Sequence, residues 1–456
     1  MRTFNLPANS LMRSKDFLFG VATSSFQIEG DRKGRETCIW DTFCAQSGKI
    51  SDNSNGDDAC RHIEKWKDDV ELISSLGVDA YRLSISWPRV MTIDGDVNEM
   101  GMQFYVNLVD ELVRRGIKVF VTLYHWDLPQ HLEDNGGWLN RDTAYAFEKY
   151  ATAVASTLGD KVYAYATLNE PFCSAYLGYE LGVHAPGLTG VGKGRKAAHH
   201  LLLAHGLAMK ALRATCPNSL HGIVLNFSTC HPATNNEEDK IAAKLADEYH
   251  NQWYLKPVID GQYPSIIHQL RDVDRPDIEE GDMDIISQPI DYLGINYYTR
   301  TVYKATPSDS ADVNFGFEIV EPTNTPLTAM GWEITPDAFT ELLVNLHQQY
   351  ALPPIYITEN GAAMDDEMID GEVNDVDRID YFNSHLNAVN VAIEAGVDIR
   401  GYFAWSLMDN FEWALGYSKR FGIVHVDYDT QKRTLKQSAH VYSELVKNRI
   451  NGTLAV

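Results

Sequence analysis

The chain is poor in cysteine, and its cysteines lack the spacing of metal or redox motifs. Six cysteines are spread over 456 residues, and no two of them form a Cys-x-x-Cys pair. This argues against a zinc ribbon or a redox dithiol. The cysteine density is also far below that of small secreted proteins held together by disulfides. We therefore expect free, buried thiols in a reducing compartment.

Long apolar runs are missing as well. No stretch of about 18 apolar residues occurs, which predicts that the chain has no transmembrane helix and no membrane partner. The N-terminal residues are interrupted by Pro7, Arg13 and Lys15, so they do not form the apolar core of a signal peptide. A cytoplasmic location is the simplest expectation.

Positive charge is scarce too. The chain has 39 Lys and Arg residues against 63 Asp and Glu, a net charge of −24. Nucleic acids and anionic membranes are bound by clusters of Lys and Arg, so neither is expected as a partner. His199, His200 and His205 lack the spacing of a zinc-binding H-E-x-x-H motif, and residues 190–195 lack the spacing of a phosphate-binding loop. We expect no metal and no cofactor.

Eight short apolar runs alternate with longer helical patterns in a chain that is 44% hydrophobic. Such runs are typical of parallel strands that are buried on both faces. The predicted strands are 17–23, 80–86, 118–124, 163–168, 222–227, 292–296, 355–358 and 401–405. The spacing of apolar residues predicts helices over 57–76, 98–115, 141–158, 193–215, 336–350 and 376–395.

This alternation predicts an α/β fold with one (β/α)8 TIM barrel as a single domain over residues 1–456. No linker rich in Pro, Gly or Ser divides the chain. An open, doubly wound sheet is the alternative, and eight units fit barrel closure better. Two polar segments, 305–328 and 364–375, are predicted to be long loop insertions.

Polar and aromatic side chains follow nearly every predicted strand. The active site of such a barrel lies at the C-terminal ends of its strands. Ordinary strand ends would carry small capping residues, so amides, aromatics, His and Glu at these positions indicate a binding site. The residues are Gln27, Arg82, His125, Trp126, Asn169, Glu170, Asn226, Asn296, Tyr298, Glu359, Trp405, Glu412 and Trp413.

Two of these residues, Glu170 and Glu359, follow the fourth and seventh strands, on roughly opposite sides of the barrel. Hydrolysis of a glycosidic bond needs two carboxyl groups across one sugar ring, one as acid and one as nucleophile or base. The surrounding amides and imidazole suit sugar hydroxyls, and aromatic faces suit the sugar ring. The pattern therefore predicts a glycoside hydrolase. A Schiff-base lysine or a metal cluster, as in other barrel enzymes, is not found at a strand end.

Eight sequence blocks resemble the family 1 glycoside hydrolases, in particular bacterial-type β-glucosidases, and they span nearly the whole chain. In order they are FLFGVATSSFQIEG, YRLSISWPR, TLYHWDLP, TLNEP, INYYTR, ITENG, WSLMDNFEW and GYSKRFGIVHVD. The resemblance implies a retaining β-glucosidase that acts on cellobiose, cello-oligosaccharides and aryl β-glucosides, with side activity on β-galactosides and β-fucosides. It leaves a homo-oligomer open.

The same resemblance implies roles for individual residues. Glu359 resembles the nucleophile and Glu170 the general acid/base, with carboxyl groups about 5–5.5 Å apart. Arg82 and Tyr298 resemble groups that contact Glu359 and favour its charged form. The charge on Glu359 should in turn raise the pKa of Glu170. Sugar-binding residues implied in this way are Gln27, His125, Trp126, Asn169, Asn296, Tyr298, Trp405, Glu412, Trp413 and Phe421, and Trp332 resembles the platform for the leaving group.

Several positions bear on the alternatives. Relatives that cleave 6-phosphoglycosides carry Ser in place of Glu412 and Tyr in place of Phe421, and a carboxylate at Glu412 would repel a 6-phosphate. Non-catalytic sugar-binding relatives lose one or both of the catalytic glutamates, and this chain keeps both. Phe172 stands where many relatives have Trp, and little consequence is expected. Cys173 lies close to Glu170 in sequence, and we interpret it as a packing residue.

The identity of residue 412 generates a first prediction. The enzyme should hydrolyse an aryl β-glucoside and an aryl β-galactoside in preference to an aryl 6-phospho-β-glucoside, because Glu412 would repel the phosphate. Comparing kcat/KM across these three substrates is the test. A preference for the phosphorylated substrate would contradict the interpretation of Glu412.

Overall fold

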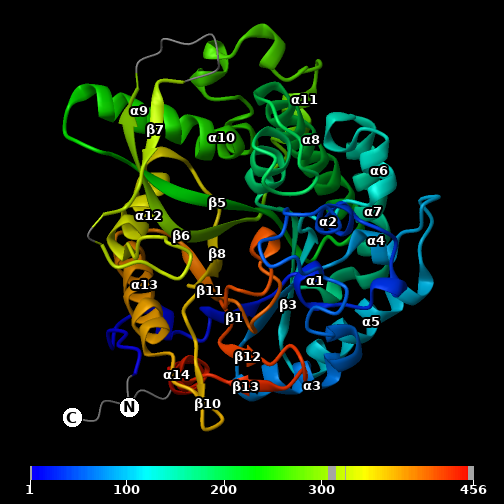
Figure 1. The fold of residues 1–456 in the computed structure, drawn as a ribbon, viewed down its shortest axis with the longest axis vertical. Helices are drawn as coiled ribbons and strands as arrows, with labels where there is room; N and C mark the ends of the chain where they lie inside the picture. The colour runs from blue at the N-terminus through cyan, green and yellow to red at the C-terminus, as the bar shows by residue number, and fades with distance from the viewer. Residues whose placement is uncertain (1–2, 307–314, 324, 450–456) are drawn as a thin grey trace.

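The chain folds around a closed barrel of eight parallel strands (Figure 1). In the computed structural model, which describes residues 3–306, 315–323 and 325–449, each barrel strand pairs with two neighbours, and the β5–β6 pairing closes the ring. The predicted (β/α)8 barrel is confirmed, and the open sheet is excluded. The barrel strands are β1 (Leu18–Ala22), β2 (Ala80–Ser84), β3 (Lys118–Tyr124), β4 (Ala164–Asn169), β5 (Leu220–Pro232), β6 (Tyr292–Ala305), β8 (Ile355–Asn360) and β11 (Ile399–Trp405).

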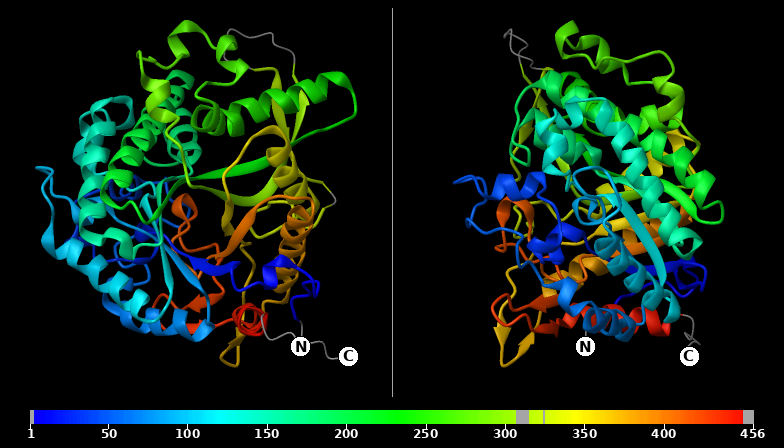
Figure 2. Two further views of the ribbon diagram at one scale, coloured as in Figure 1. Left: turned by 180° about the vertical axis from the view of Figure 1, so that it is seen from behind. Right: turned by 90° about the vertical axis from the view of Figure 1, so that its right-hand side faces the viewer.

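Long helices form the outer layer of the barrel, as the two further views in Figure 2 show. Five of the six predicted helices agree with the structure to within two residues at each end. The helix predicted from residue 57 begins later, at His62, because Arg61 before it has a left-handed backbone with φ of 47°. The long helices are α3 (His62–Leu76), α5 (Glu99–Arg114), α7 (Asp142–Leu158), α8 (Val191–Thr215), α12 (Pro336–Gln349), α13 (Val376–Glu394) and α14 (Gln437–Asn448).

Shorter elements fill the connections between the barrel strands and the long helices. The short helices are α1 (Ser25–Ile28), α2 (Ile39–Cys44), α4 (Trp87–Val90), α6 (Gln130–Asp134), α9 (Glu237–Asp247), α10 (Trp253–Asp260) and α11 (Asp282–Ile286). A π-helical segment, η5 (Cys173–Glu180), follows β4. The short strands are β7 (Phe317–Val320), β9 (Met368–Ile369), β10 (Glu372–Val373), β12 (Val424–Val426) and β13 (Arg433–Leu435).

Two barrel strands are much longer than predicted. β5 and β6 continue past the barrel as a paired ribbon, and β7 adds to it in antiparallel orientation (Figure 1). The ribbon is only half-buried, so its sequence lacks the continuous apolar run that marks a central strand. The prediction of a loop over 305–328 is therefore wrong for β7, while residues 307–314 and 324 lie outside the described residues. The predicted loop at 364–375 contains the β9–β10 hairpin.

Aromatic rings fill the lower half of the barrel. Phe120 of β3 lies at the centre, with ring centroids 4.8 Å from Phe403 and 5.3 Å from both Tyr163 and Tyr356. Large side chains in this layer make the barrel a packed core with no channel through it. The polar strand ends therefore face a site that is open at the C-terminal side only. All described elements belong to this barrel or its cover, and one domain over residues 1–456 stays a prediction.

Neither the cysteines nor the clustered histidines, His199, His200 and His205, form a metal site in the described residues. All six cysteines are free thiols. His199 contacts Asp282 and Tyr263, His200 contacts the carbonyl of Trp138, and His205 contacts Thr167. Within the described ranges, no group of three or more His, Cys, Asp or Glu side chains is placed to hold a metal ion. No helix in the described part of the chain is long and apolar enough to cross a membrane.

Candidate active site

The carboxylate of Glu359, on β8, is held between a guanidinium and a phenol. Its Oε1 accepts a hydrogen bond of 2.5 Å from Nη1 of Arg82 on β2. Its Oε2 accepts one of 2.6 Å from the hydroxyl of Tyr298 on β6. Both hydrogen bonds run from a donor to a carboxylate oxygen, and the one from Arg82 is also an ion pair. Residues of three strands, β2, β6 and β8, thus hold the two carboxylate oxygens of Glu359 in place.

Glu170 sits at a sharp turn directly after β4. Its backbone has a φ of 47°, a left-handed conformation that is uncommon for residues other than glycine. Its N–H donates to the carbonyl of Val224, and its side chain is 6% exposed. Oε1 accepts from Nδ2 of Asn296 at 2.6 Å, and Oε2 lies 3.1 Å from the sulfur of Cys173. Unfavourable backbone of this kind is typical of functional positions.

A chain of hydrogen bonds links the two carboxyl groups, and Arg82 fixes its direction. Arg82 has donors only, so Oδ1 of Asn169 must be the atom that accepts from its Nη2, at 2.7 Å. The same Oδ1 accepts from Nδ2 of Asn296 at 3.0 Å, and this nitrogen also donates to Glu170. Oδ1 of Asn296 accepts from Thr358 at 2.7 Å, which is consistent with that orientation. Turning Asn169 over would set its NH2 group against two donors, and turning Asn296 over would set its oxygen against two acceptors.

The two carboxyl groups differ in their protonation. Burial and the nearby charge of Glu359 raise the pKa of Glu170 to about 7. Glu170 faces one amide and one thiol, whereas Glu359 faces a full positive charge. At neutral pH the site therefore holds one charged carboxylate opposite a carboxyl group that can carry a proton. Pairs of this kind are how a site separates an acid from a nucleophile or base.

Both carboxyl groups open onto a cavity of about 480 Å³. One wall is an aromatic stack in which the ring of His125 lies between Trp405 and Trp413, with centroids 6.0 Å from each. Trp126 packs on Trp413 at 4.5 Å. On the other wall, Tyr298, Trp332 and Phe421 contact one another. The predicted residues that line this cavity are His125, Trp126, Glu170, Asn226, Tyr298, Trp332, Glu359, Trp405, Glu412, Trp413 and Phe421.

Glu412 is a third carboxyl group in this cavity. Among the described residues, none donates a hydrogen bond to its side chain. Burial and the charges of Glu359 and Glu170 raise the pKa of Glu412 to about 8. Its oxygens are therefore available to bond a ligand that offers hydroxyl groups, and they are poorly suited to a second anion.

Three predicted residues lie behind the cavity wall. Gln27, Asn169 and Asn296 are fully buried, and none of them lines the cavity. Nε2 of Gln27 donates to Oδ1 of Asn410 and to the carbonyl of Phe411, and its Oε1 accepts from Ser24. Gln27 thus supports the segment that carries Glu412. Direct contact between Gln27 and a sugar stays a prediction.

His125 is neutral and has a free ring nitrogen. Burial and the charge of Arg82 lower its pKa well below the usual range. Nδ2 of Asn169, whose orientation Arg82 fixes, donates to Nε2 of His125 at 3.1 Å. The proton of the neutral ring therefore sits on Nδ1, which has no partner among the described residues. A buried donor without a partner at a cavity wall is suited to the oxygen of a ligand hydroxyl.

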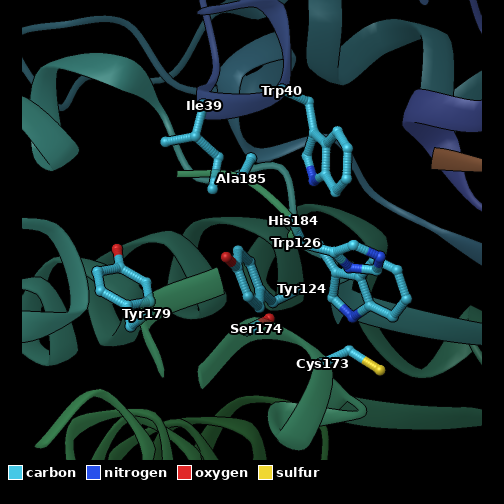
Figure 3. Close-up of a pocket in the computed structure, with 9 residues that line it drawn as sticks. All are labelled: Ile39, Trp40, Tyr124, Trp126, Cys173, Ser174, Tyr179, His184 and Ala185. Atoms are coloured by element: carbon cyan, nitrogen blue, oxygen red, sulfur yellow. The ribbon is translucent and has the colours of Figure 1, made fainter. Parts of the chain in front are cut away.

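Several residues of the cavity carry no sequence signal that marks them. Cys173 contacts Glu170, and Phe172, Tyr176 and Leu181 line the same cavity. They belong to the π-helical segment after β4 or flank it. In the sequence, their nearness to Glu170 is the one signal that they belong to the site. A small pocket lies behind them and shares Trp126, Cys173 and His184 with the main cavity (Figure 3). The interpretation of Cys173 as packing alone is incomplete.

Comparison with known proteins decides the family. The family model described as glycosyl hydrolase family 1 matches residues 11–451. The chain belongs to glycosyl hydrolase family 1. It is 46% identical to a beta-glucosidase of Agrobacterium over 97% of this chain and 96% of the relative. It is 45% identical to beta-glucosidase A of Thermotoga maritima over 95% of this chain and 97% of the relative. A bifunctional beta-D-glucosidase/beta-D-fucosidase of Bifidobacterium breve is 45% identical over 95% of this chain and 97% of the relative.

Solved structures of the family superpose closely on the chain. The AHE enzyme of Alicyclobacillus herbarius has a TM-score of 0.93 at 45% identity, with both chains fully covered. A Thermotoga maritima family 1 glycoside hydrolase in complex with a cyclophellitol analogue, a transition-state mimic, has a TM-score of 0.91 at 43% identity over 96% and 98% of the two chains. The virulence factor SghA of Agrobacterium tumefaciens, in complex with its substrate analogue salicin, has a TM-score of 0.92 at 46% identity over 94% and 95%.

The raised pKa of Glu170 has a consequence for stability that does not depend on activity. The folded protein keeps a proton on Glu170 up to a pH of about 7, whereas the ordinary pKa is 4.5. As pH rises through this window the unfolded chain loses its proton first, so Glu170 increasingly destabilises the fold. Glu170→Gln should therefore raise the free energy of unfolding relative to wild type at pH 8.5, by on the order of 3 kcal/mol.

Denaturant unfolding from pH 5 to pH 8.5 measures this effect, and the gain from Glu170→Gln should shrink as the pH falls. The exposed Glu444 offers a matched control, because Glu444→Gln should change stability little at any pH. A stability difference for Glu170→Gln that does not grow with pH would contradict a raised pKa.

Proposed function

We propose that this family 1 enzyme is a retaining β-glucosidase, which removes terminal non-reducing β-D-glucosyl residues by double displacement. The observation that carries the proposal is the unequal treatment of two carboxyl groups in one cavity. Glu359 is held as a carboxylate by Arg82 and Tyr298, and Glu170 is able to hold a proton at neutral pH. Relatives at 45–46% identity are named beta-glucosidases, which supports glucose as the sugar.

In the first step, Glu359 attacks the anomeric carbon of the bound glucoside. A bond forms between a carboxylate oxygen and that carbon while the bond to the leaving-group oxygen breaks. Glu170 donates its proton to that oxygen, so the leaving group departs as a neutral alcohol. Arg82 and Tyr298 hold Glu359 in the geometry of attack. The product of this step is a glucosyl ester on Glu359 and a deprotonated Glu170.

In the second step, water cleaves the ester. Esterification removes the negative charge of Glu359, which is one of the two causes of the raised pKa of Glu170. The pKa of Glu170 therefore falls, and its carboxylate becomes the base that takes a proton from water. The water oxygen bonds the anomeric carbon, the ester bond breaks, and Glu359 returns as a carboxylate. Two inversions at one carbon give net retention of the β configuration.

The closed end of the cavity suits an unphosphorylated sugar. Trp405 and Trp413 offer apolar faces to the ring, and His125 and Glu412 offer a donor and an acceptor to its hydroxyls. Burial and the charges of Glu359 and Glu170 raise the pKa of Glu412, and a 6-phosphate would bring a further negative charge into the same cavity, which argues against 6-phosphoglucosides. The fucosidase activity named for the Bifidobacterium relative supports side activity on β-fucosides, and we expect the same for β-galactosides.

Non-catalytic sugar binding on this fold has less support. Both glutamates are present, and each has the partners that its role requires. A binding protein would gain nothing from a carboxyl group whose pKa lies near 7. No cofactor takes part in the proposed reaction. The cytoplasmic location expected from the sequence is consistent with six free thiols and stays a proposal.

The open end of the cavity favours apolar leaving groups. Beyond Glu170 the wall consists mainly of apolar and aromatic side chains, among them Ile319 of the edge strand β7 and Leu181, which are 58% and 45% exposed. Its polar side chains are fewer: Asn226, Ser228, Asn251, Thr299 and Thr301. A second sugar ring would need polar partners in this region, whereas a flat aromatic group gains from apolar contact alone. The salicin complex named for SghA fits this chemistry. We therefore rank aryl β-glucosides above cellobiose and longer cello-oligosaccharides as substrates.

The assignment of Glu359 generates a prediction about a trapped intermediate. A 2-deoxy-2-fluoro β-glucoside with an activated leaving group should inactivate the enzyme and leave a fluoroglucosyl ester on Glu359, because the fluorine slows both steps while the activated leaving group keeps the first one fast. Mass spectrometry of a proteolytic digest locates the adduct. Glu359→Ala should lower kcat/KM by a factor on the order of 10⁴ or more.

Two results would overturn this assignment. One is an adduct on any residue other than Glu359. The other is unchanged hydrolysis by Glu359→Ala.

The apolar rim generates a prediction about leaving groups. Ile319→Asn should raise KM for 4-methylumbelliferyl β-glucoside several-fold, because loss of apolar contact costs about 1 kcal/mol, while KM for cellobiose should change less than twofold. Ile93 is equally exposed at 58% and lies outside the cavity, so Ile93→Asn is the matched control. An equal effect of Ile319→Asn on both substrates would contradict an apolar leaving-group site.

A further inference from the structure

The sulfur of Cys173 lies beside the oxygen of Glu170 that faces away from Asn296. The distance from Sγ to Oε2 is 3.1 Å, and the backbone N–H of Cys173 donates to the carbonyl of Glu170 at 2.8 Å. Cys173 is 7% exposed and lines both the main cavity and the small pocket behind it, where it lies across from Trp40 (Figure 3). Cys173, three residues after Glu170, thus lies against the side chain of Glu170.

The sulfur is a thiol at every pH at which the enzyme would work. Burial and the neighbouring charge of Glu170 raise the pKa of Cys173 well above its usual range. A thiol is a weak donor and a weak acceptor, so it can face either form of a carboxyl group. Towards a charged Glu170 it donates its S–H, and towards the neutral acid it accepts weakly.

The surrounding hydrogen bonds decide which oxygen of Glu170 carries the acid proton. Nδ2 of Asn296 has two hydrogens, and both are used, one by Asn169 and one by Oε1 of Glu170. A proton on Oε1 would face that donor, so the neutral acid must carry its proton on Oε2. Within the described residues, Cys173 is the one side chain that hydrogen-bonds Oε2.

We propose that Cys173 is a positioning residue: it faces Oε2, where Asn296 confines the acid proton of Glu170, and it holds that proton weakly enough to be given to the leaving group. This inference rests on the proposed role of Glu170 as general acid. A strong acceptor at this position would compete with the leaving group for the proton, and a strong donor would favour the charged form of Glu170. The Cys173 sulfur is both a weak acceptor and a weak donor, which suits its contact with Glu170, a group that must alternate between acid and base.

Other ionisable groups face Glu170 from the rest of the barrel, and the test must separate them from Cys173. Their effects on Glu170 are common to wild type and to any variant at position 173. They are Arg82 on β2, His125 after β3, Tyr298 on β6, Glu359 on β8, and Glu412 after β11, with His184 and His250 further along the cavity.

Two substitutions of Cys173 should move the alkaline limb of the pH profile of kcat/KM in opposite directions. Cys173→Ser places a stronger donor beside Oε2, which favours the charged form and should lower the apparent pKa of the limb by roughly 0.5–1 pH unit. Cys173→Ala removes the donor and should raise it. Cys216 is fully buried, lies outside the cavity and donates to a backbone carbonyl, so Cys216→Ala is the matched control and should leave the limb in place.

The substrate should matter in the same experiment. With phenyl β-glucoside, whose leaving group needs a proton, Cys173→Ser should lower kcat/KM at pH 7 by about two- to fivefold, because a smaller fraction of Glu170 is protonated. With 2,4-dinitrophenyl β-glucoside, whose leaving group departs without one, the change should stay below twofold. A merely structural defect would lower both values together.

The outcomes separate this inference from the function on which it rests. Two results would overturn the role of Cys173 while hydrolysis itself remains. One is an alkaline limb that has the same apparent pKa in both Cys173 variants as in wild type. The other is an equal loss of kcat/KM on both substrates. A limb that persists in Glu170→Gln would show that Glu170 is not the acid, and both proposals would fall. Opposite shifts for Ser and Ala, with no shift for Cys216→Ala, are the supporting result, and thermal melts of each variant confirm that it is folded.

Discussion

The guanidinium of Arg82 is the group on which the arrangement of the site depends. It is 1% exposed, it has donors only, and it gives one hydrogen bond to Glu359 and one to Asn169. Because it cannot accept, the orientation of Asn169, the orientation of Asn296, the tautomer of His125 and the proton position on Glu170 all follow from it. One buried cation on β2 therefore determines hydrogen-bond directions on β3, β4 and β6. A neutral donor in its place would leave each of these choices open.

Charge balance in the cavity points to the same constraint. Three carboxyl groups, Glu170, Glu359 and Glu412, line one cavity, and the buried cation Arg82 pairs with Glu359 alone among them. Burying an unpaired charge is costly, so the carboxyl groups that lack a cation hold protons more tightly, and the pKa rises to about 7 for Glu170 and about 8 for Glu412. In the proposed mechanism, Glu170 is the acid because it lies outside the ion pair, and it becomes a base once the charge on Glu359 is lost in the ester.

Much of this could be predicted from sequence, for physical reasons that particular elements illustrate. Buried parallel strands leave continuous apolar runs, so all eight barrel strands were found, and residues directly after them, such as Glu170, had to lie at one face. The β5–β6 ribbon was missed because a half-buried strand has no such run. The resemblance implies that Gln27 contacts the sugar; in the structure its amide nitrogen donates to Asn410 and Phe411, and the sugar contact stays a prediction. The contact of Cys173 depends on the left-handed turn at Glu170, which no local pattern marks.

The division of labour between the two carboxyl groups can be observed directly by ¹³C NMR of enzyme labelled at the glutamate side-chain carboxyls. The Glu170 resonance would be assigned by its loss in Glu170→Gln and followed over pH in the free enzyme and in the fluoroglucosyl ester. The account predicts a titration near pH 7 in the free enzyme that moves to lower pH in the ester. A Glu170 carboxyl that is charged throughout the neutral range, or whose titration is unchanged by esterification, would contradict it.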